Sequence, residues 1–186
     1  ITIYAGICRL PPAHVMRIEQ RGKKMSCYWR PDTETELKLK SDAEYAEAFR
    51  EKFSEAVRCC LRSPFPVASR LSGGMDSSSI SCMARDILKS QGDNRPLKTF
   101  SAIFDHLPSI EVIDERQYQD YVIAAGGIEP HRVSMASCPP LGAYIDGQRH
   151  IDFPFIGWSH YMSRGLYSKA RDEGVKTILC GIGGDD

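Results

Sequence analysis

The sequence has few of the features that mark membrane, secreted or nucleic-acid-binding proteins. No apolar run approaches the length of a membrane span, and no signal peptide is visible. The 24 basic residues balance 24 acidic ones, so the charge favours neither a nucleic-acid surface nor a membrane surface. The seven cysteines include no CxxC pair, which argues against a zinc site and a disulfide framework. We therefore expect free thiols in the cytoplasm, and neither nucleic acid nor membrane as a partner.

Two common nucleotide-binding patterns, GxxxxGK[ST] and GxGxxG, are also missing. In their place the string LSGGMDSS, residues 71–78, stands between an apolar run and a run with helical spacing. Its two glycines let backbone N–H groups approach a ligand closely, and its serines add hydroxyl donors. The N-terminus of the following helix adds unpaired N–H groups and a partial positive charge. The string predicts a cradle for phosphate or pyrophosphate, in which Asp76 holds a magnesium ion that bridges phosphate oxygens.

The rest of the chain predicts extended structure followed by alternating strands and helices. Residues 1–30 read as extended, residues 31–41 as a polar linker, and Ser41 with Glu44 as a capping box. The expected helices are 42–62, 76–90, 114–125 and 159–173, and the expected strands from residue 66 on are 66–71, 97–104, 131–135 and 175–180. The residues expected to face the core are, in the first helix, Ala46, Phe49, Phe53, Val57 and Cys60, and, in the third, Tyr118, Val122 and Ala125.

This alternation predicts an α/β fold, with a parallel sheet flanked by helices and right-handed crossovers. Ligands of such sheets bind at the carboxyl ends of the strands. The LSGGMDSS string, the end of strand 97–104 and the terminal GIGGDD all follow such ends, so three segments are expected to converge on one crevice. Ser69 and Arg70 interrupt the apolar strand 66–71, and Arg70 is expected to extend to solvent or to pair with a carboxylate.

Four segments together resemble the synthetase domain of the asparagine synthetase family, within the PP-loop ATP pyrophosphatase superfamily. They are SGGMDSS, KTFSAIF, DERQY and GVKTILCGIGGDD. The run YAGICRLPPAHVMRIEQ with CYWRP is similar to the end of the family's amino-terminal glutaminase domain. The resemblance implies the end of an N-terminal-nucleophile glutaminase domain plus a linker at 1–40, and the first part of a synthetase domain of the adenine nucleotide α-hydrolase type at 41–186. We interpret the chain as part of a longer protein, with the glutaminase nucleophile and the family's catalytic lysine outside it.

The resemblance also implies site residues. Those expected to hold the β- and γ-phosphates are Ser72, Gly73, Gly74, Asp76, Ser77 and Ser78. Leu71 and Ala102 would flank the adenine, and Cys180 with Gly181 would close on the nucleoside. Asp76 and Asp185 would hold Mg²⁺, although a turn carboxylate is the plainer interpretation of Asp185. Glu115 would contact the substrate or orient a loop, and an ordinary exposed glutamate at a helix start remains open there.

The implied activity is that of an ATP-dependent amide ligase that forms AMP and pyrophosphate through an acyl-adenylate. It would join a small-molecule or peptide carboxylate to ammonia or an amine, and a homodimer stays open. Asparagine synthetases have glutamate at the position of Ile182, in the pattern GxG[SAG]D[DE], and isoleucine cannot accept a proton. β-Lactam synthetases and lasso-peptide cyclases of the same family vary there, so asparagine, a β-lactam and a peptide macrolactam are all candidate products. Residues 136–160 are expected to shape the acceptor pocket.

Two other functions are weighed against this one. A PP-loop sulfur-transfer enzyme acting on transfer RNA would need catalytic cysteines and a basic face, and neither is evident. A non-catalytic nucleotide-binding remnant would be consistent with Arg70 in the first strand of the sheet and Ile182 in the last loop.

Overall fold

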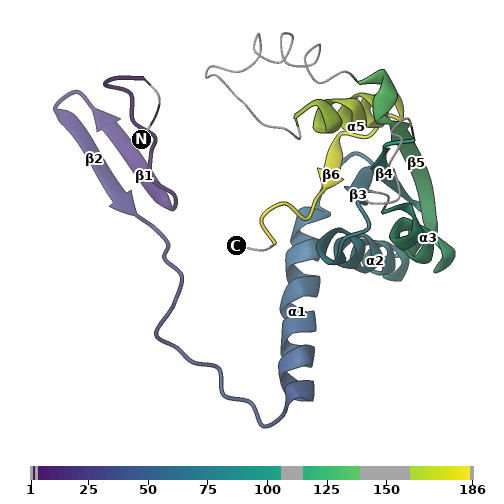
Figure 1. Cartoon of the computed structure of the whole chain (residues 1–186). Helices are drawn as coiled ribbons and strands as arrows, with labels where there is room; N and C mark the ends of the chain where they lie inside the picture. Colours follow the sequence, from purple (N-terminus) through teal and green to yellow (C-terminus); the bar gives the residue numbers. More distant parts are fainter. Residues whose placement is uncertain (1, 3, 106–114, 139–159, 185–186) are drawn as a thin grey trace. The chain divides into compact units, whose positions relative to one another are not determined.

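The computed structural model describes residues 2, 4–105, 115–138 and 160–184. The chain divides into two units, Ile1–Tyr45 and Ala46–Asp186, and each is described by itself (Figure 1). Among the described residues, no helix is both long and apolar enough to cross a bilayer.

The first unit is built around an antiparallel hairpin of β1 (His14–Glu19) and β2 (Gly22–Cys27). The extended structure expected for residues 1–30 is wrong near the start, because Tyr4 to Gly6 form a bend and a turn with Gly6 at φ +76°. The capping box of Ser41 and Glu44 forms in a shifted version. The Ser41 hydroxyl accepts the Glu44 N–H at 3.3 Å, and the Glu44 carboxylate accepts the N–H of Lys40 at 2.8 Å.

The second unit contains a parallel four-stranded sheet with the strand order β5-β4-β3-β6. Its strands are β3 (Val67–Arg70), β4 (Leu97–Ile103), β5 (Ile128–Ser134) and β6 (Thr177–Leu179). The helices are α1 (Asp42–Cys60), α2 (Met75–Ser90), α3 (Arg116–Ala124) and α5 (His160–Asp172), with a 3-10 turn η2 (Met135–Ser137). The predicted α/β fold with a parallel sheet flanked by helices is confirmed.

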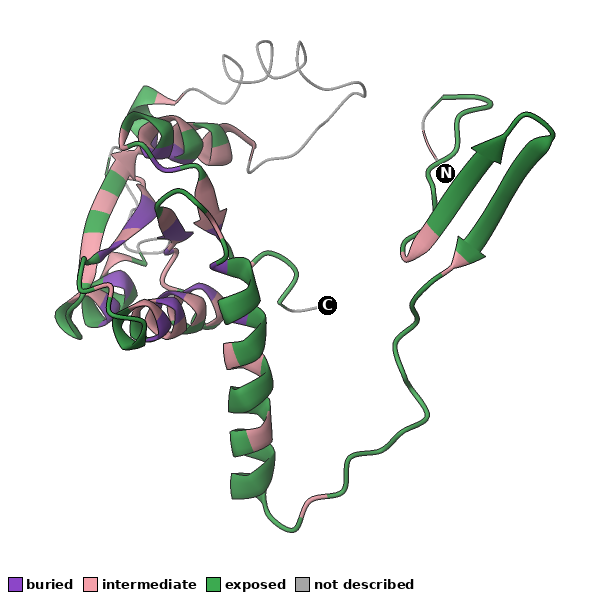
Figure 2. Ribbon diagram, turned by 180° about the vertical axis from the view of Figure 1, so that it is seen from behind, coloured by how far each residue is buried: buried purple, intermediate pink, exposed green. Residues whose placement is uncertain are grey.

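Two apolar clusters cover the two faces of this sheet, and buried residues follow them in Figure 2. On one face Val57 of α1 and Ala84 and Ile87 of α2 pack with Leu97 and Leu179 of the strands. On the other face the cluster joins α5 and the segment after it to β3 and β4 through Ala68, Phe100, Leu166, Ala170 and Val175. Because side chains alternate along a strand, neighbouring residues of β3 face different helices.

This alternation accounts for the two polar residues of β3. Ser69 is fully buried, and its hydroxyl lies 2.8 Å from that of Ser81 on α2, which in turn donates to the Ser77 carbonyl at 2.7 Å. Arg70 faces the opposite helix, where its Nη1 donates to the Ser163 hydroxyl of α5 at 3.4 Å. A carboxylate partner for Arg70 was one of two expectations, and none of the described carboxylates forms an ion pair with it.

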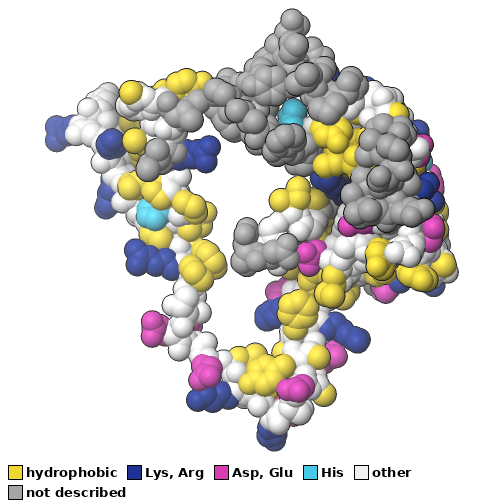
Figure 3. Space-filling view, in the orientation of Figure 1, with side chains coloured by type: hydrophobic (Ala, Val, Ile, Leu, Met, Phe, Trp, Pro, Cys, Tyr) yellow, Lys and Arg dark blue, Asp and Glu magenta, His cyan; other side chains and the backbone are white. Residues whose placement is uncertain are grey.

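The expected apolar stripe of α1 is only partly core. Of its five residues Val57 is buried and Phe53 half-buried, whereas Ala46, Cys60 and Phe49 are exposed, Phe49 by 71%. Figure 3 shows hydrophobic side chains at the surface of α1 beside acidic and basic ones. The helical period predicts an amphipathic helix correctly, but it does not tell which turns the sheet covers.

The expected buried face of α3 is also wrong in part. Val122 is buried, but Tyr118 is 51% exposed and Ala125 is exposed. Gln119, only 2% exposed, takes the inner position instead, because its amide makes hydrogen bonds that satisfy it there.

The carboxylate of Glu173, just after α5, binds two lysines across the edge of the sheet. It accepts from Lys169 at 2.7 Å and from Lys98 at 2.9 Å, and these bonds lower the pKa of Glu173 from 4.5 to about 2. The stabilisation is therefore complete above about pH 4.5 and is lost as the pH falls towards 2. We expect Glu173→Gln to flatten the fall in unfolding free energy over that range, as measured by urea denaturation at several pH values.

The matched control for this prediction is Glu55→Gln, which removes an exposed ion pair with Lys52 on α1. It should change the acid dependence less, because water screens an exposed pair. Identical acid dependence in the wild type and Glu173→Gln would contradict the prediction.

Candidate nucleotide-binding site

The order of the strands reverses at β3. The chain adds β4 and then β5 on one side of β3, and later returns to place β6 on its other side. Beyond the carboxyl ends of two parallel strands at such a reversal, the loops separate and leave a crevice for a ligand. The loop after β3 is residues 71–74, and the loop after β6 begins at Cys180. These are the two glycine-rich segments of the sequence.

The loop after β3 is shaped by two of its own serines. The Ser77 hydroxyl accepts the N–H of Ser72 at 3.2 Å and donates to the carbonyl of Gly74 at 3.1 Å. The Ser72 hydroxyl lies 2.9 Å from that of Ser77 and accepts the N–H of Gly74 at 3.3 Å. Since Ser77 donates to Gly74, the hydrogen between the two hydroxyls comes from Ser72. Both serine side chains therefore fix the turn around the two glycines.

Contacts from β4 and α3 anchor this loop. The N–H of Leu71 donates to the Phe100 carbonyl at 3.0 Å, and the Ser101 hydroxyl donates to the Leu71 carbonyl at 2.6 Å. The buried Gln119 side chain donates to the carbonyl of Ser72 at 3.1 Å. Sequence reasoning missed Ser101 and Gln119. A polar residue on the inner face of an expected helix was the available signal for Gln119.

The first turn of α2 presents N–H groups and one carboxylate. Gly74 is its N-cap and offers no side-chain cap, so the first N–H groups of the helix stay available to an anion. Asp76 stands in this turn, where the helix dipole favours a negative charge. Ser78 is one turn further on and uses its N–H in a bond of 3.0 Å to the Gly74 carbonyl.

The loop after β6 packs directly on this turn. A Cβ at Gly181 would lie 2.8 Å from the Asp76 Cβ and 3.1 Å from the Ser77 nitrogen. A Cβ at Gly184 would lie 2.8 Å from Oδ2 of Asp76. Only glycine therefore lets the two loops approach this closely. Asp185 follows Gly184 in the sequence and lies outside the described residues.

Two hollows open beside these loops. The polar hollow, about 260 Å³, is lined by Arg70, Ser72, Gly74, Asp76, Ser77, Gly181 and Ile182. The side hollow, about 310 Å³, is lined by Arg70, Leu71, Ser72, Ala102, Phe104, Glu115 and Met162.

The structure brings most of the predicted site residues together around these hollows. Gly73 adjoins both walls, since a Cβ there would lie 2.9 Å from the Glu115 carbonyl. Leu71 lies in a wall of the side hollow but is fully buried, so it supports the wall from behind. Cys180 is separated from Ala102 and lines a third space instead.

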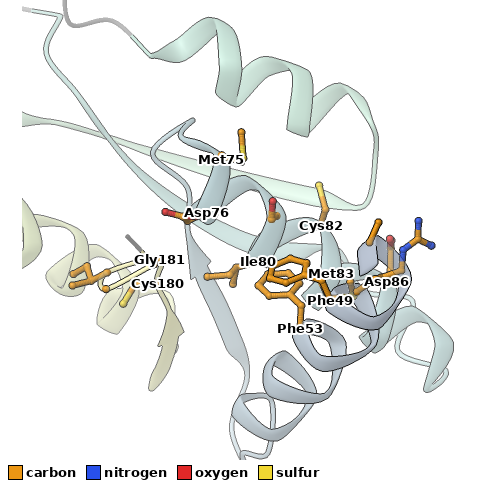
Figure 4. A pocket seen from close by; sticks show the side chains of 16 residues that line it. Phe49, Phe53, Met75, Asp76, Ile80, Cys82, Met83, Asp86, Cys180 and Gly181 are labelled. Atoms are coloured by element: carbon orange, nitrogen blue, oxygen red, sulfur yellow. The ribbon is translucent and has the colours of Figure 1, made fainter. Parts of the chain in front are cut away.

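That third space is the apolar hollow, about 770 Å³, between α1, α2 and the loop after β6. Figure 4 shows the rings of Phe49 and Phe53 beside Ile80 and Met83, with Asp76 and Gly181 further along. The two rings are stacked with their centroids 5.9 Å apart. The exposed part of the α1 stripe thus faces a hollow that reaches the acidic residue of the polar hollow.

The family model for asparagine synthase matches residues 48–186, which include the sheet, the glycine-rich loops and all of the hollows except Ala46. The chain belongs to the asparagine synthase family. The resemblance read from the four sequence segments is thereby confirmed, and the chain is a member of a family of ATP-using amide ligases.

Several curated proteins match this member of the asparagine synthase family. The amidases chyE of Penicillium rubens and chry2 of Gibberella zeae are each 27% identical to it over the whole chain, which spans 29% of their length. Asparagine synthetase [glutamine-hydrolyzing] 3 of Bacillus subtilis is 33% identical over 55% of the chain and 16% of its own length. A solved NMN synthetase from Francisella tularensis aligns with a TM-score of 0.38 and 17% identity, over 74% of this chain and 53% of that one, a likeness too weak to support an inference.

Proposed function

We propose that this member of the asparagine synthase family is an ATP-dependent amide ligase that releases AMP and pyrophosphate. The observation that carries the proposal is the polar hollow at the reversal of strand order. There the open N-terminus of α2, the Gly73–Gly74 turn and Asp76 face the loop after β6. Free N–H groups and a single carboxylate suit a polyphosphate with its metal ion better than a neutral ligand.

In this proposal the polar hollow takes the β- and γ-phosphates of ATP. Backbone N–H groups of the loop and of the first turn of α2 donate to the phosphate oxygens, while Ser72 and Ser77 keep the turn in shape. The side hollow takes the nucleoside, against Ala102 and the wall that Leu71 supports. Gly181 closes on the nucleotide from β6.

Magnesium fits the residues that line the polar hollow. Mg²⁺ prefers oxygen ligands and binds through one or two carboxylates together with phosphate oxygens, and Asp76 supplies such a carboxylate. We assign the ion to Asp76 and Asp185. When bound, it would neutralise negative charge on the departing pyrophosphate. Asp76 itself orients the triphosphate by this charge, and Glu115 lines the side hollow, where it would contact the acyl substrate or order the loop.

The chemistry has two steps. A carboxylate oxygen of the substrate attacks the α-phosphorus, the bond from that phosphorus to the bridging oxygen breaks, and pyrophosphate leaves with the electron pair. The nitrogen of ammonia or an amine then attacks the acyl carbon, AMP leaves, and the nitrogen loses a proton to form the amide. The N–H groups around the loop stabilise the first leaving group without moving, which is how a preorganised site lowers a barrier.

The identity of the product depends on the loop after β6. Ile182 is 75% exposed and lines both the polar and the apolar hollow, where asparagine synthetases would carry a proton-accepting glutamate. We therefore favour a specialised carboxylate over aspartate as the substrate. The amidase names of the two fungal relatives are consistent with chemistry at an amide bond. Residues 1–40 are proposed to end a glutaminase-like domain that would supply ammonia.

The test is ATP–pyrophosphate exchange by the intact protein, with and without aspartate and with a panel of other carboxylates. We expect radiolabelled pyrophosphate to enter ATP only when an accepted carboxylate is present, because exchange needs the reversible adenylate. Release of ADP and phosphate instead of AMP would overturn the proposal. So would ATP binding without exchange for any carboxylate, which would favour the nucleotide-binding remnant, and amide hydrolysis that needs no ATP.

A further inference from the structure

Arg70 lies where the two hollows meet, and the function proposed above gives it no task. This inference rests on that proposed function. We propose that Arg70 binds the α-phosphate of the nucleotide and stabilises the charge on that phosphate while the carboxylate attacks it. In this role Arg70 is a catalytic residue of the first half-reaction.

The position of Arg70 follows from the sheet. It is the last residue of β3, next to Phe100 of β4, and it shares the α5 face of the sheet with Ala68. It is one of only two residues, with Ser72, that line both the polar hollow and the side hollow. In ATP the α-phosphate joins the nucleoside to the β- and γ-phosphates. If those parts occupy the two hollows, the α-phosphate lies at the boundary that Arg70 and Ser72 form.

The charge of Arg70 is unmatched within the described residues. Its side chain is half-buried, and its one hydrogen bond there is the 3.4 Å contact from Nη1 to the Ser163 hydroxyl. A guanidinium has five N–H donors in a rigid fork, so four remain for a ligand. A half-buried cation without a carboxylate partner is unfavourable unless an anion completes it. The fork matches the two non-bridging oxygens of a phosphate, which it can bind with two parallel hydrogen bonds.

The other arginines of the second unit show how different this arrangement is. Arg85 is held by Asp86 at 2.8 Å and by the Gly126 carbonyl at 3.1 Å, and Arg132 is held by Asp120 and Gln119. Arg95 forms two bonds with Asp93. These arginines have protein carboxylates as partners, and none of them lines the polar or the side hollow. Arg70 alone in this comparison combines a free fork with a place at the site.

The same fork would also suit a second carboxylate on the acyl substrate, so the test separates the two sources of negative charge. Binding of adenosine, AMP, pyrophosphate and ATP to the intact protein is measured by competition against a fluorescent ATP analogue. The variants are Arg70→Leu, Arg70→Lys and, as the matched control, Arg85→Leu, which removes a half-buried arginine far from both hollows.

We expect Arg70→Leu to weaken AMP and ATP binding roughly 10- to 100-fold, the effect of losing a charge-assisted hydrogen bond, and to leave adenosine and pyrophosphate binding unchanged. Arg70→Lys should recover part of the AMP affinity, and Arg85→Leu should bind all four ligands as the wild type does. Unchanged adenosine binding also shows that the variant is folded.

Unchanged AMP affinity in Arg70→Leu would overturn the assignment, and a raised KM for the carboxylate in the exchange assay would then assign the fork to the acyl substrate. Equal weakening of adenosine and AMP would also overturn it, because the defect would then be one of structure. Failure of the wild-type protein to bind ATP at all is a different result and would count against the proposed function.

Discussion

Replacing Asp76 by asparagine is expected to lower the rate of ATP–pyrophosphate exchange on the order of 100- to 1000-fold, the usual effect of removing one preorganised electrostatic contact from a site. Asp76 stands in the first turn of α2, lines the polar hollow and lies under Gly184, with no described basic residue paired to it. Asparagine has nearly the same shape but no charge, so it would hold Mg²⁺ far less well. The measurement is exchange at a series of Mg²⁺ concentrations.

The matched control is Asp86→Asn on the same helix, where the carboxylate is 62% exposed and pairs with Arg85. It removes the same charge and should leave exchange within about twofold of the wild type, since surface pairs contribute little. Higher Mg²⁺ should partly restore Asp76→Asn and not affect the control. Exchange at the wild-type rate in Asp76→Asn would show that the carboxylate does not serve the metal.

Replacing Gly73 by alanine is expected to destabilise the protein by about 2 to 5 kcal/mol, because two unfavourable effects add. Gly73 has φ +106°, a conformation that an L residue rarely adopts. Its new Cβ would also lie 2.9 Å from the Glu115 carbonyl oxygen and 3.2 Å from Cβ of Tyr118. Either the loop or the start of α3 must move. The measurement is the free energy of unfolding in urea, together with ATP binding.

Two other glycines separate these effects. Gly92 has φ +89° and open space around it, so Gly92→Ala reports backbone strain alone and should cost about 1 kcal/mol. Gly74 has φ −67°, and a Cβ there would lie 3.5 Å from the Ser72 hydroxyl, an ordinary contact, so Gly74→Ala should be the mildest of the three for stability. The order Gly73, Gly92, Gly74 is the prediction. A Gly73→Ala protein as stable as Gly92→Ala would show that α3 yields without loss.

The sequence predicts the fold of this protein well where the pattern is local. Each strand of the parallel sheet and each helix around it falls within a few residues of its expected range, because apolar runs, prolines and glycines set those ends. Burial is predicted less well. The periodicity of α1 and α3 gives a face but not its extent, so Phe49 is exposed, and Gln119 is buried because Ser72 and Arg132 bond its amide.

The candidate site shows the same division. The loop at residues 71–78 is visible in the sequence because its glycines and serines act on one another across a few residues. The approach of Gly181 and Gly184 to Asp76 depends on β6 pairing with β3, which the alternation of strands and helices implies without fixing it. Arg70 looked misplaced in a buried strand because the sequence does not show which strand end opens onto a hollow.

The pairing of β3 with β6 has a consequence for the order in which this protein assembles. β6 is only three residues long and pairs Val67 with Thr177, whereas β3 pairs with β4 and β4 with β5 across much shorter stretches of chain. Closing the longest loop carries the largest loss of chain entropy, so this contact should form last. A nucleotide held by both loops would then act as a clamp on the final folding step, and its binding free energy would add directly to the docking of β6.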